Sequence, residues 1–472
     1  MAFFDINEQY KDNILAIDDE KNQVSYSDLY EYAMKMSDVI DHRCLVFLFA
    51  SNSIGSIVNY LSFLNNRIVP VLLNWQIEKE LASNLLDLYK PEYIILPDKA
   101  AEKYIEFETV SEGYGYKILK TDFDRKFDLY DELALLLTTS GSTGSPKLVR
   151  QSYKNIDANA NSIAEYLCID SKERPITSLP MNYTYGLSII NSHALKGATI
   201  LVTDKSLMQK EFWSFLKEEE ATSIAGVPYN YEILEKLRFF RMTLPSLKTM
   251  TQAGGKLSPE LHKKFAEYAR DNDKHFVVMY GQCEATARMA YLPYEKSLEK
   301  YGSMGVAIPG GKFTLIDAEG KEINDADTVG ELVYEGPNVT LGYAERGEDL
   351  IKGDERGGVL VTGDMAKRDE EGYYYIVGRK KRFLKVYGNR VNLDETERLL
   401  KTKFDYMDCA CGGVDDHMYI FVTSKEVEND VKDYISSITH LNPAAFSVVW
   451  IDEIPKNDSG KTKYSELEKY YN

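Results

Sequence analysis

Cysteine and tryptophan are both scarce in this sequence, which has five cysteines and three tryptophans in 472 residues. The cysteines are odd in number and mostly isolated, so we do not expect a disulfide framework. Cys409 and Cys411 are two apart, which places both on one face of a strand. Neither a histidine nor a second cysteine pair lies at metal-site spacing from them. We therefore interpret them as buried thiols.

Long hydrophobic runs and a basic excess are also missing. The apolar run CLVFLFA, residues 44–50, is far shorter than a membrane span, and the first residues, MAFFDINEQYKDN, lack the basic start and cleavage site of a signal peptide. The formal net charge of −18 opposes binding of duplex nucleic acid. We expect a cytoplasmic globular protein of two or three domains, without a membrane span or a nucleic-acid partner.

Two common nucleotide-binding motifs are absent. The P-loop spacing fails, because the residue five after Gly141 is Pro146, and Lys147 is followed by Leu148. No G-x-G-x-x-G run follows a strand, which argues against a dinucleotide-dependent oxidoreductase.

Short apolar runs alternate with helical patterns over the first three hundred residues and predict a parallel sheet covered by helices. These runs are CLVFLFA, IVPVLLN, YIILP, LALLLTTS, ATILVTD and KHFVVMYG. One helix is well marked, with Ser258 as N-cap, Pro259 in the first position and Leu261, Phe265, Tyr268 and Ala269 on one face. After about residue 310, period-two alternation around glycine-containing turns predicts antiparallel hairpins.

The segment LLLTTSGSTGSPKLVR, residues 135–150, follows a buried strand with glycines, hydroxyl residues and a lysine. Backbone N–H groups and hydroxyls in such a concavity suit a phosphate, although an ordinary exposed turn has the same composition. Its candidate ligands are Thr138, Thr139, Ser140, Gly141, Ser142, Thr143, Gly144 and Lys147.

The segment GRKKRFLKVYGNR, residues 378–390, carries six basic residues and no acidic one. It is either a solvated surface ribbon or a site for an anionic ligand. Asn392, followed by Glu395, begins a new helix, and the residues beyond resemble a small α+β module. We place the domain boundary here, with a core domain at 1–379 and a C-terminal domain at 380–472.

Seven motifs occur in order and together resemble the core motifs of the adenylate-forming superfamily, which includes acyl-CoA synthetases, peptide synthetase adenylation domains and firefly luciferase. The motifs are TTSGSTGSPK (138–147), QAGGKL (252–257), YGQCEAT (280–286), GELVYEGPNVTLGY (330–343), TGD (362–364), GRKKRFLKVYGNR (378–390) and PKNDSGK (455–461). The resemblance covers roughly residue 20 to the C-terminus. It implies an α/β core domain with a distorted antiparallel β subdomain, and a small mobile α+β C-terminal domain.

The same resemblance implies a two-step reaction. A carboxylic acid attacks the α-phosphorus of ATP to give an acyl-adenylate and pyrophosphate, and a thiol then displaces AMP. The segment 138–147 would hold the leaving phosphates, and Glu284, with Thr139, would bind Mg²⁺. Adenine would lie between Ala253–Gly255 and the Tyr280–Gln282 loop, which contains Gly281. Asp364 would accept hydrogen bonds from the ribose, supported by Arg379.

Lys461 matches the superfamily's catalytic lysine, which bridges the carboxylate and the α-phosphate. Because it lies in the C-terminal domain, the resemblance also implies that this domain swings about a hinge, here Lys381. Gly388 matches the glycine beside which a pantetheine arm passes.

The sequence departs from the familiar patterns at the expected acid pocket. Tyr183 stands where many acyl-CoA synthetases have histidine, and no Asp occurs between Ser178 and Ser192 to pair with an α-ammonium, which argues against α-amino acids. Tyr183, Tyr185 and Tyr229 are candidate wall residues. Cys283 replaces the usual threonine, and Tyr464 replaces a common arginine.

Gln282 together with EATARM, residues 284–289, resembles acyl- and aryl-CoA ligases more than peptide synthetases, which typically have proline in place of Gln282. We therefore expect a stand-alone ligase of a small or medium organic acid, with coenzyme A or a phosphopantetheinyl acyl carrier protein as acceptor. The alternatives are a non-catalytic nucleotide-binding homologue that serves as a regulatory or scaffolding subunit, an adenylation-only amino-acid ligase, and a luciferase-like oxygenase.

Overall fold

A computed structural model describes residues 8–124, 126–138, 147–386, 389–414, 416–439, 441–456 and 462–471. Its described residues form two compact units. The large unit contains residues up to 138 together with 147–312 and 334–360, and the small unit contains 313–333 and the residues from 361 onward. Each unit is described by itself.

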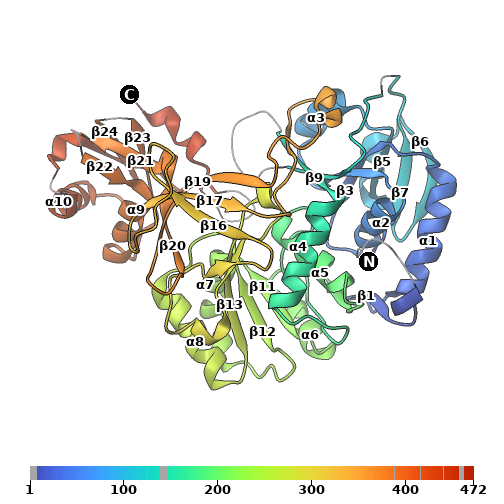
Figure 1. Cartoon of the computed structure of the whole chain (residues 1–472), viewed down its shortest axis with the longest axis horizontal. Helices are drawn as coiled ribbons and strands as arrows, with labels where there is room; N and C mark the ends of the chain where they lie inside the picture. The colour runs from blue at the N-terminus through green and yellow to red at the C-terminus, as the bar shows by residue number, and fades with distance from the viewer. Residues whose placement is uncertain are drawn as a thin grey trace. The chain divides into compact units, whose positions relative to one another are not determined.

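The first sheet of the large unit has eight strands (Figure 1). In spatial order they are β18 (Gly342–Ala344), β9 (Leu148–Ser152), β8 (Leu133–Thr138), β4 (Val69–Asn74), β3 (Leu45–Ala50), β5 (Tyr93–Pro97), β7 (Tyr116–Lys120) and β6 (Glu108–Gly113). The four strands β8, β4, β3 and β5 are parallel, and the strands beyond them pair antiparallel. The predicted parallel sheet is thus confirmed, with antiparallel edges that the apolar runs did not reveal.

Strand β3 shows why its sequence is apolar without alternation. Val46 and Leu48 pack in one core with helices α1 (Tyr26–Val39) and α2 (Ile54–Asn65), whereas Leu45 and Phe47 pack in another with α3 (Lys79–Tyr89). Successive side chains of a strand point to opposite faces. Both faces of this strand are covered, so every position is buried.

The second sheet of the large unit holds the strand ends that matter for function. Its order is β11 (Ser223–Gly226), β12 (Thr249–Gln252), β13 (His275–Tyr280), β14 (Ala290–Tyr291) and β15 (Val306–Ala307), of which the first three are parallel. A three-stranded sheet joins β10 (Ile200–Val202), β1 (Ile14–Asp18) and β2 (Gln23–Ser25). The remaining helices of this unit are α4 (Tyr153–Tyr166), α5 (Thr184–Ala194), α6 (Lys210–Glu218), α7 (Pro228–Lys236) and α8 (Pro259–Asp271).

Helix α8 confirms the best-marked helix prediction. The Ser258 hydroxyl accepts a hydrogen bond from the N–H of Leu261, and Pro259 occupies the first turn, where its missing N–H costs nothing. Leu261, Phe265 and Ala269 are buried on one face. The cap and the proline therefore mark the start of this helix, and the four-residue spacing marks its buried face, on which the predicted Tyr268 is only partly buried.

The small unit combines antiparallel strands with an α+β module. One sheet contains β16 (Lys312–Ile316), β17 (Gly330–Glu335), β19 (Val359–Arg368) and β20 (Tyr374–Arg379), which confirms the predicted hairpins. Beyond it lie the hairpin β21 (Phe383–Val386) and β22 (Asn389–Asn392), the sheet β23 (Cys409–Val414), β24 (His417–Val422) and β25 (Phe446–Trp450), and the helices α9 (Leu393–Lys403) and α10 (Glu428–Thr439). Because β19 pairs with β20, residues 361–379 fall in this unit, and the functional boundary at residue 380 stays a prediction.

Two local predictions in the small unit are confirmed. Asn392 caps helix α9 by accepting hydrogen bonds from the N–H groups of Asp394 and Glu395. Cys409 and Cys411 lie on the same face of β23 and are fully buried. Burial raises the pKa of the Cys409 thiol to about 12, so it stays protonated and packs as a small apolar group.

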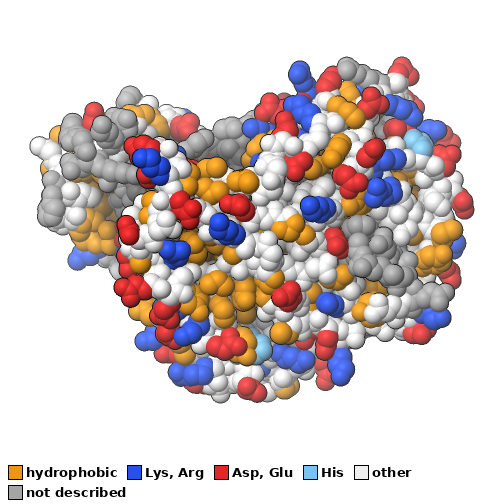
Figure 2. All heavy atoms as spheres, viewed as in Figure 1, with side chains coloured by type: hydrophobic (Ala, Val, Ile, Leu, Met, Phe, Trp, Pro, Cys, Tyr) orange, Lys and Arg blue, Asp and Glu red, His pale blue; other side chains and the backbone are white. Residues whose placement is uncertain are grey.

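Within the described ranges, no helix is both long and apolar enough to cross a membrane. On the face that Figure 2 shows, basic and acidic side chains are intermingled, and no continuous basic surface is visible among the residues that are coloured by type. This distribution agrees with the acidic net charge of the sequence.

Candidate active site

Part of the predicted site lies outside the described residues. This part comprises Thr139, Ser140, Gly141, Ser142, Thr143 and Gly144 of the phosphate segment, together with Gly388 and Lys461. The residues that flank the phosphate segment are described. Thr138 ends strand β8 and pairs with Leu148 of β9, so the segment joins two antiparallel strands of the large sheet.

Glu284 is held at the carboxyl end of strand β13, in the short turn Cys283–Ala285. Its Oε1 accepts a hydrogen bond of 2.7 Å from the phenol of Tyr343. Its backbone oxygen accepts hydrogen bonds from the N–H and the hydroxyl of Thr340, both at 3.0 Å. Within the described residues no lysine or arginine forms an ion pair with this carboxylate, so Oε2 stays available to a cation.

Tyr343 joins Glu284 to two basic residues. The Lys147 ammonium lies 4.5 Å from the centroid of the Tyr343 ring, and the guanidinium carbon of Arg356 lies 4.8 Å from it. Arg356 also donates to the backbone oxygen of Glu284 (2.9 Å) and to the Thr340 hydroxyl (2.8 Å). Burial, and then the neighbouring carboxylate of Glu284, raises the pKa of Tyr343 to about 12, so its phenol stays a donor.

The segment after strand β12 is shaped by close contacts. Gly254 has a φ of +84°, and a Cβ atom there would lie 2.7 Å from the phenol oxygen of Tyr183. A Cβ on Gly255 would meet the ring of Pro228 at 3.0 Å. Gln252, fully buried below them, donates to the backbone oxygens of Ala253 (3.2 Å) and Gly255 (2.9 Å). Only small residues let this segment approach its neighbours so closely.

The Tyr280–Gln282 loop is equally constrained. A Cβ on Gly281 would lie 1.6 Å from the backbone oxygen of Ala287, so this position requires glycine. The Gln282 amide donates to the phenol of Tyr280 (3.1 Å), which orients both side chains. Thr286 and Ala287 have positive φ angles of 51° and 87°. Such conformations are uncommon for residues other than glycine and cluster at functional sites.

The three tyrosines predicted for the acid pocket occupy different surroundings. The Tyr183 and Tyr185 rings meet edge to face, with centroids 6.4 Å apart, and pack against the ends of strands β11 and β12. The Tyr185 phenol donates to the Thr251 hydroxyl (2.9 Å), and burial raises its pKa to about 12. Tyr229 lies on α7 and is 52% exposed. The structure therefore brings the first two together, and Tyr229 is apart from the cluster that they form.

Asp364 and Arg379 belong to the small unit and face each other across strands β19 and β20. Arg379 Nε lies 3.5 Å from Oδ1 of Asp364. The Asp364 side chain is only 7% exposed, and its backbone N–H donates to the Thr362 hydroxyl. The predicted pairing of an acceptor carboxylate with a supporting arginine is thus present.

The basic run after residue 378 is partly neutralised within the small unit. Lys380 pairs with Glu331 at 2.7 Å, and Arg382 pairs with Asp394 at 2.8 Å and with Glu397 at 2.5 Å. The backbone of Lys381 lies between these two anchored residues, in the short turn Lys380–Arg382. Several of the six charges therefore have a structural role, which weakens the interpretation of the run as an anion site.

A second group with metal-ligand chemistry lies elsewhere in the large unit. One ligand atom each of His42, Cys44 and Glu92 lie within 4.8 Å of one another. However, Glu92 is already paired with His42 and with the Lys126 ammonium. Burial raises the pKa of the Cys44 thiol to about 12, which opposes the thiolate that a metal would need. We assign no metal to this group.

Sequence reasoning missed Tyr343 and Arg356. Tyr343 ends the motif GELVYEGPNVTLGY, which was recognised as a whole without a role for its last residue. It reaches Glu284 because β18 pairs with β9 at the edge of the large sheet, with Tyr343 opposite Val149. Arg356 lies between recognised motifs, so the sequence carried no signal for it.

Comparison with known proteins decides the family. The family model described as "AMP-binding enzyme" matches residues 3–344, well over half of the chain. This chain belongs to the AMP-binding enzyme family. The predicted resemblance to adenylate-forming enzymes is confirmed. A 2-succinylbenzoate–CoA ligase from Bacillus pumilus is 28% identical over 418 residues, which cover 86% of this chain and 81% of that protein.

Solved structures support the same fold. The o-succinylbenzoate CoA synthetase of Bacillus subtilis bound to an acyl-adenylate intermediate is 22% identical, with a TM-score of 0.77, and the match covers 97% of this chain and 95% of that one. Its complex with ATP and a magnesium ion is 21% identical, also with a TM-score of 0.77, and covers 97% and 96%. The predicted fold class is therefore confirmed over nearly the whole chain.

Proposed function

We propose that this family member activates a small or medium organic carboxylic acid with ATP and transfers the acyl group to the thiol of coenzyme A. In the first step a carboxylate oxygen attacks the α-phosphorus of ATP, and pyrophosphate leaves. In the second step the thiol sulfur attacks the acyl carbon, and AMP leaves. Family membership and similarity to a CoA ligase support both steps.

One arrangement carries the proposal. Tyr343 holds one oxygen of Glu284 and lies close to two cations, Lys147 and Arg356. All four residues belong to the large unit, and Lys147 ends the segment that we assign to the phosphates. A carboxylate beside fixed positive charges suits the binding of a polyphosphate together with its divalent cation. The half-buried phenol of Tyr343 thus holds Glu284 in one orientation, which a freely solvated surface carboxylate would not have.

The residues present fit a magnesium ion. Glu284 offers a hard oxygen ligand that no described cation occupies, and Thr139 is the proposed hydroxyl partner. When bound, Mg²⁺ would offset negative charge on the phosphates. The chain's own contribution is to keep Glu284 in place, which the hydrogen bonds from Tyr343, Thr340 and Arg356 achieve.

The nucleotide roles follow from the local geometry and stay proposals. The backbone at Gly254 and Gly255, which packs closely against Tyr183 and Pro228, would form one side of the adenine site, and Tyr280 would offer a ring to stack on the base. Asp364 is an acceptor-only carboxylate suited to the ribose hydroxyls, and Arg379 lies beside it. We also propose that Lys461 stabilises the charge that develops at the α-phosphate, that Lys381 is the hinge and that Gly388 flanks the pantetheine arm.

We propose coenzyme A rather than an acyl carrier protein as the acceptor. An acidic carrier protein would be attracted by the basic run, but the ion pairs of Lys380 and Arg382 neutralise part of its charge.

We also propose that the enzyme is located in the cytoplasm. All five cysteines are free thiols, and four of them are buried. Free thiols are typical of proteins in a reducing compartment.

The deciding experiment is ATP–pyrophosphate exchange with purified protein, magnesium and a panel of fatty, aromatic, hydroxy and amino acids. The Lys461→Ala variant serves as the blank. Exchange with one acid class, followed by thioester formation only when coenzyme A is added, is the expected result. Absence of exchange by folded protein that binds ATP would overturn the proposal in favour of a non-catalytic homologue.

A further inference from the structure

Arg288 is a buried cation at the ligand-binding end of the second sheet. It lies four residues after Glu284, directly follows the positive-φ residues Thr286 and Ala287, and is only 2% exposed. Its backbone oxygen accepts hydrogen bonds from the side-chain amides of Asn159 (2.9 Å) and Asn338 (3.0 Å). These two hydrogen bonds hold the backbone of Arg288 in position.

Within the described part of the chain, the guanidinium of Arg288 contacts neutral groups only. Its Nε donates to the Ser188 hydroxyl (3.2 Å), and one terminal nitrogen donates to the Tyr166 phenol (3.1 Å) and to the sulfur of Met279 (2.9 Å). Its guanidinium carbon also lies 4.8 Å from the centroid of the Tyr185 ring. Among the described residues, no carboxylate oxygen lies within 4.0 Å of its nitrogens, and none of their oxygens accepts a hydrogen bond from the second terminal nitrogen.

Two other deeply placed arginines have carboxylate partners. Arg150, which is fully buried, pairs with Glu355, and Arg382 pairs with Asp394 and Glu397. A buried charge without a counter-charge is costly, so buried ions in proteins are normally paired. Arg288 is therefore a buried positive charge whose counter-ion the described chain does not supply.

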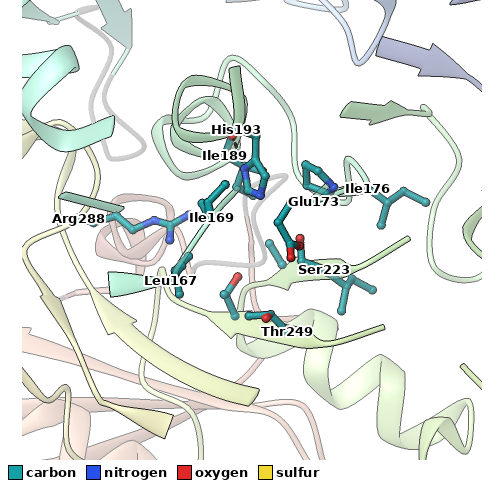
Figure 3. A pocket seen from close by; sticks show the side chains of 13 residues that line it. Leu167, Ile169, Glu173, Ile176, Ile189, His193, Ser223, Thr249 and Arg288 are labelled. Atoms are coloured by element: carbon teal, nitrogen blue, oxygen red, sulfur yellow. Dashed lines mark hydrogen bonds between the residues drawn. The ribbon is translucent and has the colours of Figure 1, made fainter. Parts of the chain in front are cut away.

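Arg288 points into a cavity of the large unit, as Figure 3 shows. Apolar side chains line much of the cavity, including Leu167, Ile169 and Ile189. One side of the cavity is formed by neighbouring strands β11 and β12, which contribute Ser223, Ala225, Thr249 and Thr251 from the same face. Thr251 also bonds Tyr185 and directly precedes Gln252–Gly255, which we assign to the nucleotide.

The other ionisable groups of the cavity do not neutralise Arg288. Burial lowers the pKa of His193 to about 4, so its ring is neutral, and its Nδ1 must donate to the Ile189 backbone oxygen at 2.8 Å. The Glu173 carboxylate accepts a hydrogen bond from the Thr222 hydroxyl and lies 3.5 Å from the Lys248 ammonium. Among the described residues that line it, the cavity thus offers one uncompensated positive charge, surrounded by mainly apolar walls.

We propose that Arg288 binds a second anionic group of the acid substrate, so that this ligase acts on dicarboxylic acids. The inference rests on the proposed function and adds the substrate class. One carboxylate is activated beside Glu284, while the other supplies the counter-ion that Arg288 lacks. The void in this cavity is small, about 20 Å³, so the hydrocarbon chain between the two carboxylates must be short. The second terminal nitrogen of Arg288 carries two N–H donors that can bind one oxygen of this carboxylate in a charge-assisted hydrogen bond.

The test compares matched acids in ATP–pyrophosphate exchange. Succinate, glutarate and adipate are each measured against the monocarboxylate of equal length, butanoate, pentanoate and hexanoate. In the unaltered protein we expect kcat/KM for the best dicarboxylate to exceed that of its monocarboxylate by at least about 100-fold, because a monocarboxylate leaves the buried guanidinium unpaired. A preference for monocarboxylates would contradict the proposed role of Arg288, while the exchange itself would still support the ligase activity. Absence of exchange with every acid would overturn both.

Two variants assign the preference to this side chain. Arg288→Met should reduce the dicarboxylate to monocarboxylate ratio by about 100-fold, and Arg288→Lys should restore part of it. The control is Arg43→Met, because Arg43 donates to the backbone oxygens of Arg67, Tyr130 and Leu133, apart from the cavity. It should keep the full ratio. An unchanged ratio in Arg288→Met would overturn the assignment.

A binding measurement guards against misfolding of the variant. Saturating dicarboxylate with ATP should raise the Tm of the unaltered protein above the value with ATP alone, and this increment should disappear in Arg288→Met. Circular dichroism checks that the variant is folded. An equal increment in both proteins would contradict the proposal even if exchange activity were lost.

Discussion

The phenol of Tyr464 donates to the carboxylate of Glu397, with distances of 3.0 and 3.2 Å to its two oxygens. The same ring lies 3.8 Å from the guanidinium carbon of Arg382, which itself pairs with Glu397. Glu397 is nearly buried and also accepts the N–H of Cys411. Tyr464 stands where the sequence pattern commonly has an arginine. Its phenol, the Arg382 guanidinium and the Glu397 carboxylate together anchor the chain three residues after Lys461.

Tyr464→Phe should therefore impair the positioning of Lys461. The variant keeps the ring over Arg382 but removes one hydrogen bond to a buried carboxylate, which costs about 1–3 kcal/mol. We expect slower ATP–pyrophosphate exchange, with transfer from preformed acyl-adenylate to coenzyme A largely kept. Tyr406→Phe, an exposed tyrosine of the same module, is the control. Equal loss in both half-reactions would show a general structural role instead.

Much of the fold could be predicted because its signals are local. Helix α8 follows from its cap, its proline and its buried face, and the central strands follow from short apolar runs. The antiparallel edge formed by β18 and β9 could not be predicted in this way. It pairs residues 342–344 with 148–150, and no local pattern specifies a partner so distant in sequence.

The site residues also differ in whether a local sequence signal or a distant contact reveals them. Motif order alone was enough to propose Glu284, Gly254 and Asp364 as site residues, and their roles stay predictions. Tyr343 and Arg288 needed the structure, because their roles depend on contacts with Glu284 and with a cavity formed by separate helices and strands. A lone arginine in the apolar stretch EATARMAY was the one signal that sequence reasoning passed over.

Glu284→Gln should abolish the first half-reaction. The amide keeps an oxygen that can accept the Tyr343 hydrogen bond but loses the charge that we assign to magnesium. We expect exchange to fall by at least about 100-fold. Exchange measured over a range of magnesium concentrations reports whether metal affinity has changed. The control is Glu345→Gln, an exposed carboxylate 3.3 Å from Lys147. If Glu284→Gln is about as active as the unaltered protein, the assignment of Glu284 as a magnesium ligand is wrong.

His262 should make the large unit sensitive to acid. It is buried, its Nδ1 accepts the N–H of Gly302, and its Nε2 faces the Ser297 hydroxyl, so the ring is neutral. Burial lowers its pKa from 6.5 to about 4. The unfolded chain therefore binds more protons between these values, and stability falls as pH drops from 6.5 towards 4. This shift corresponds to roughly 3 kcal/mol.

Urea unfolding at pH 7.5 and pH 5 tests this expectation. The difference between the two urea midpoints should be smaller in His262→Gln than in the unaltered protein, because the variant lacks a histidine that takes up a proton when the chain unfolds at pH 5. His193, whose pKa is lowered in the same direction, keeps part of the effect. His275→Gln, which changes an exposed histidine, should leave the difference unchanged. An identical difference in His262→Gln would contradict the assigned pKa shift.

Lys381→Pro tests whether the short turn Lys380–Arg382 is a hinge. The neighbours of Lys381 are anchored, Lys380 by Glu331 and Arg382 by Asp394 and Glu397, so a change of backbone angle between them would be concentrated at this residue. Proline fixes φ near −65° and removes that freedom. If the C-terminal domain must turn between the two steps, thioester formation should fall more than ATP–pyrophosphate exchange. Lys461→Ala should show the opposite pattern, losing exchange and keeping transfer from preformed acyl-adenylate. Because each variant serves as the control for the other, the same pattern in both would rule out a swing that separates the two half-reactions.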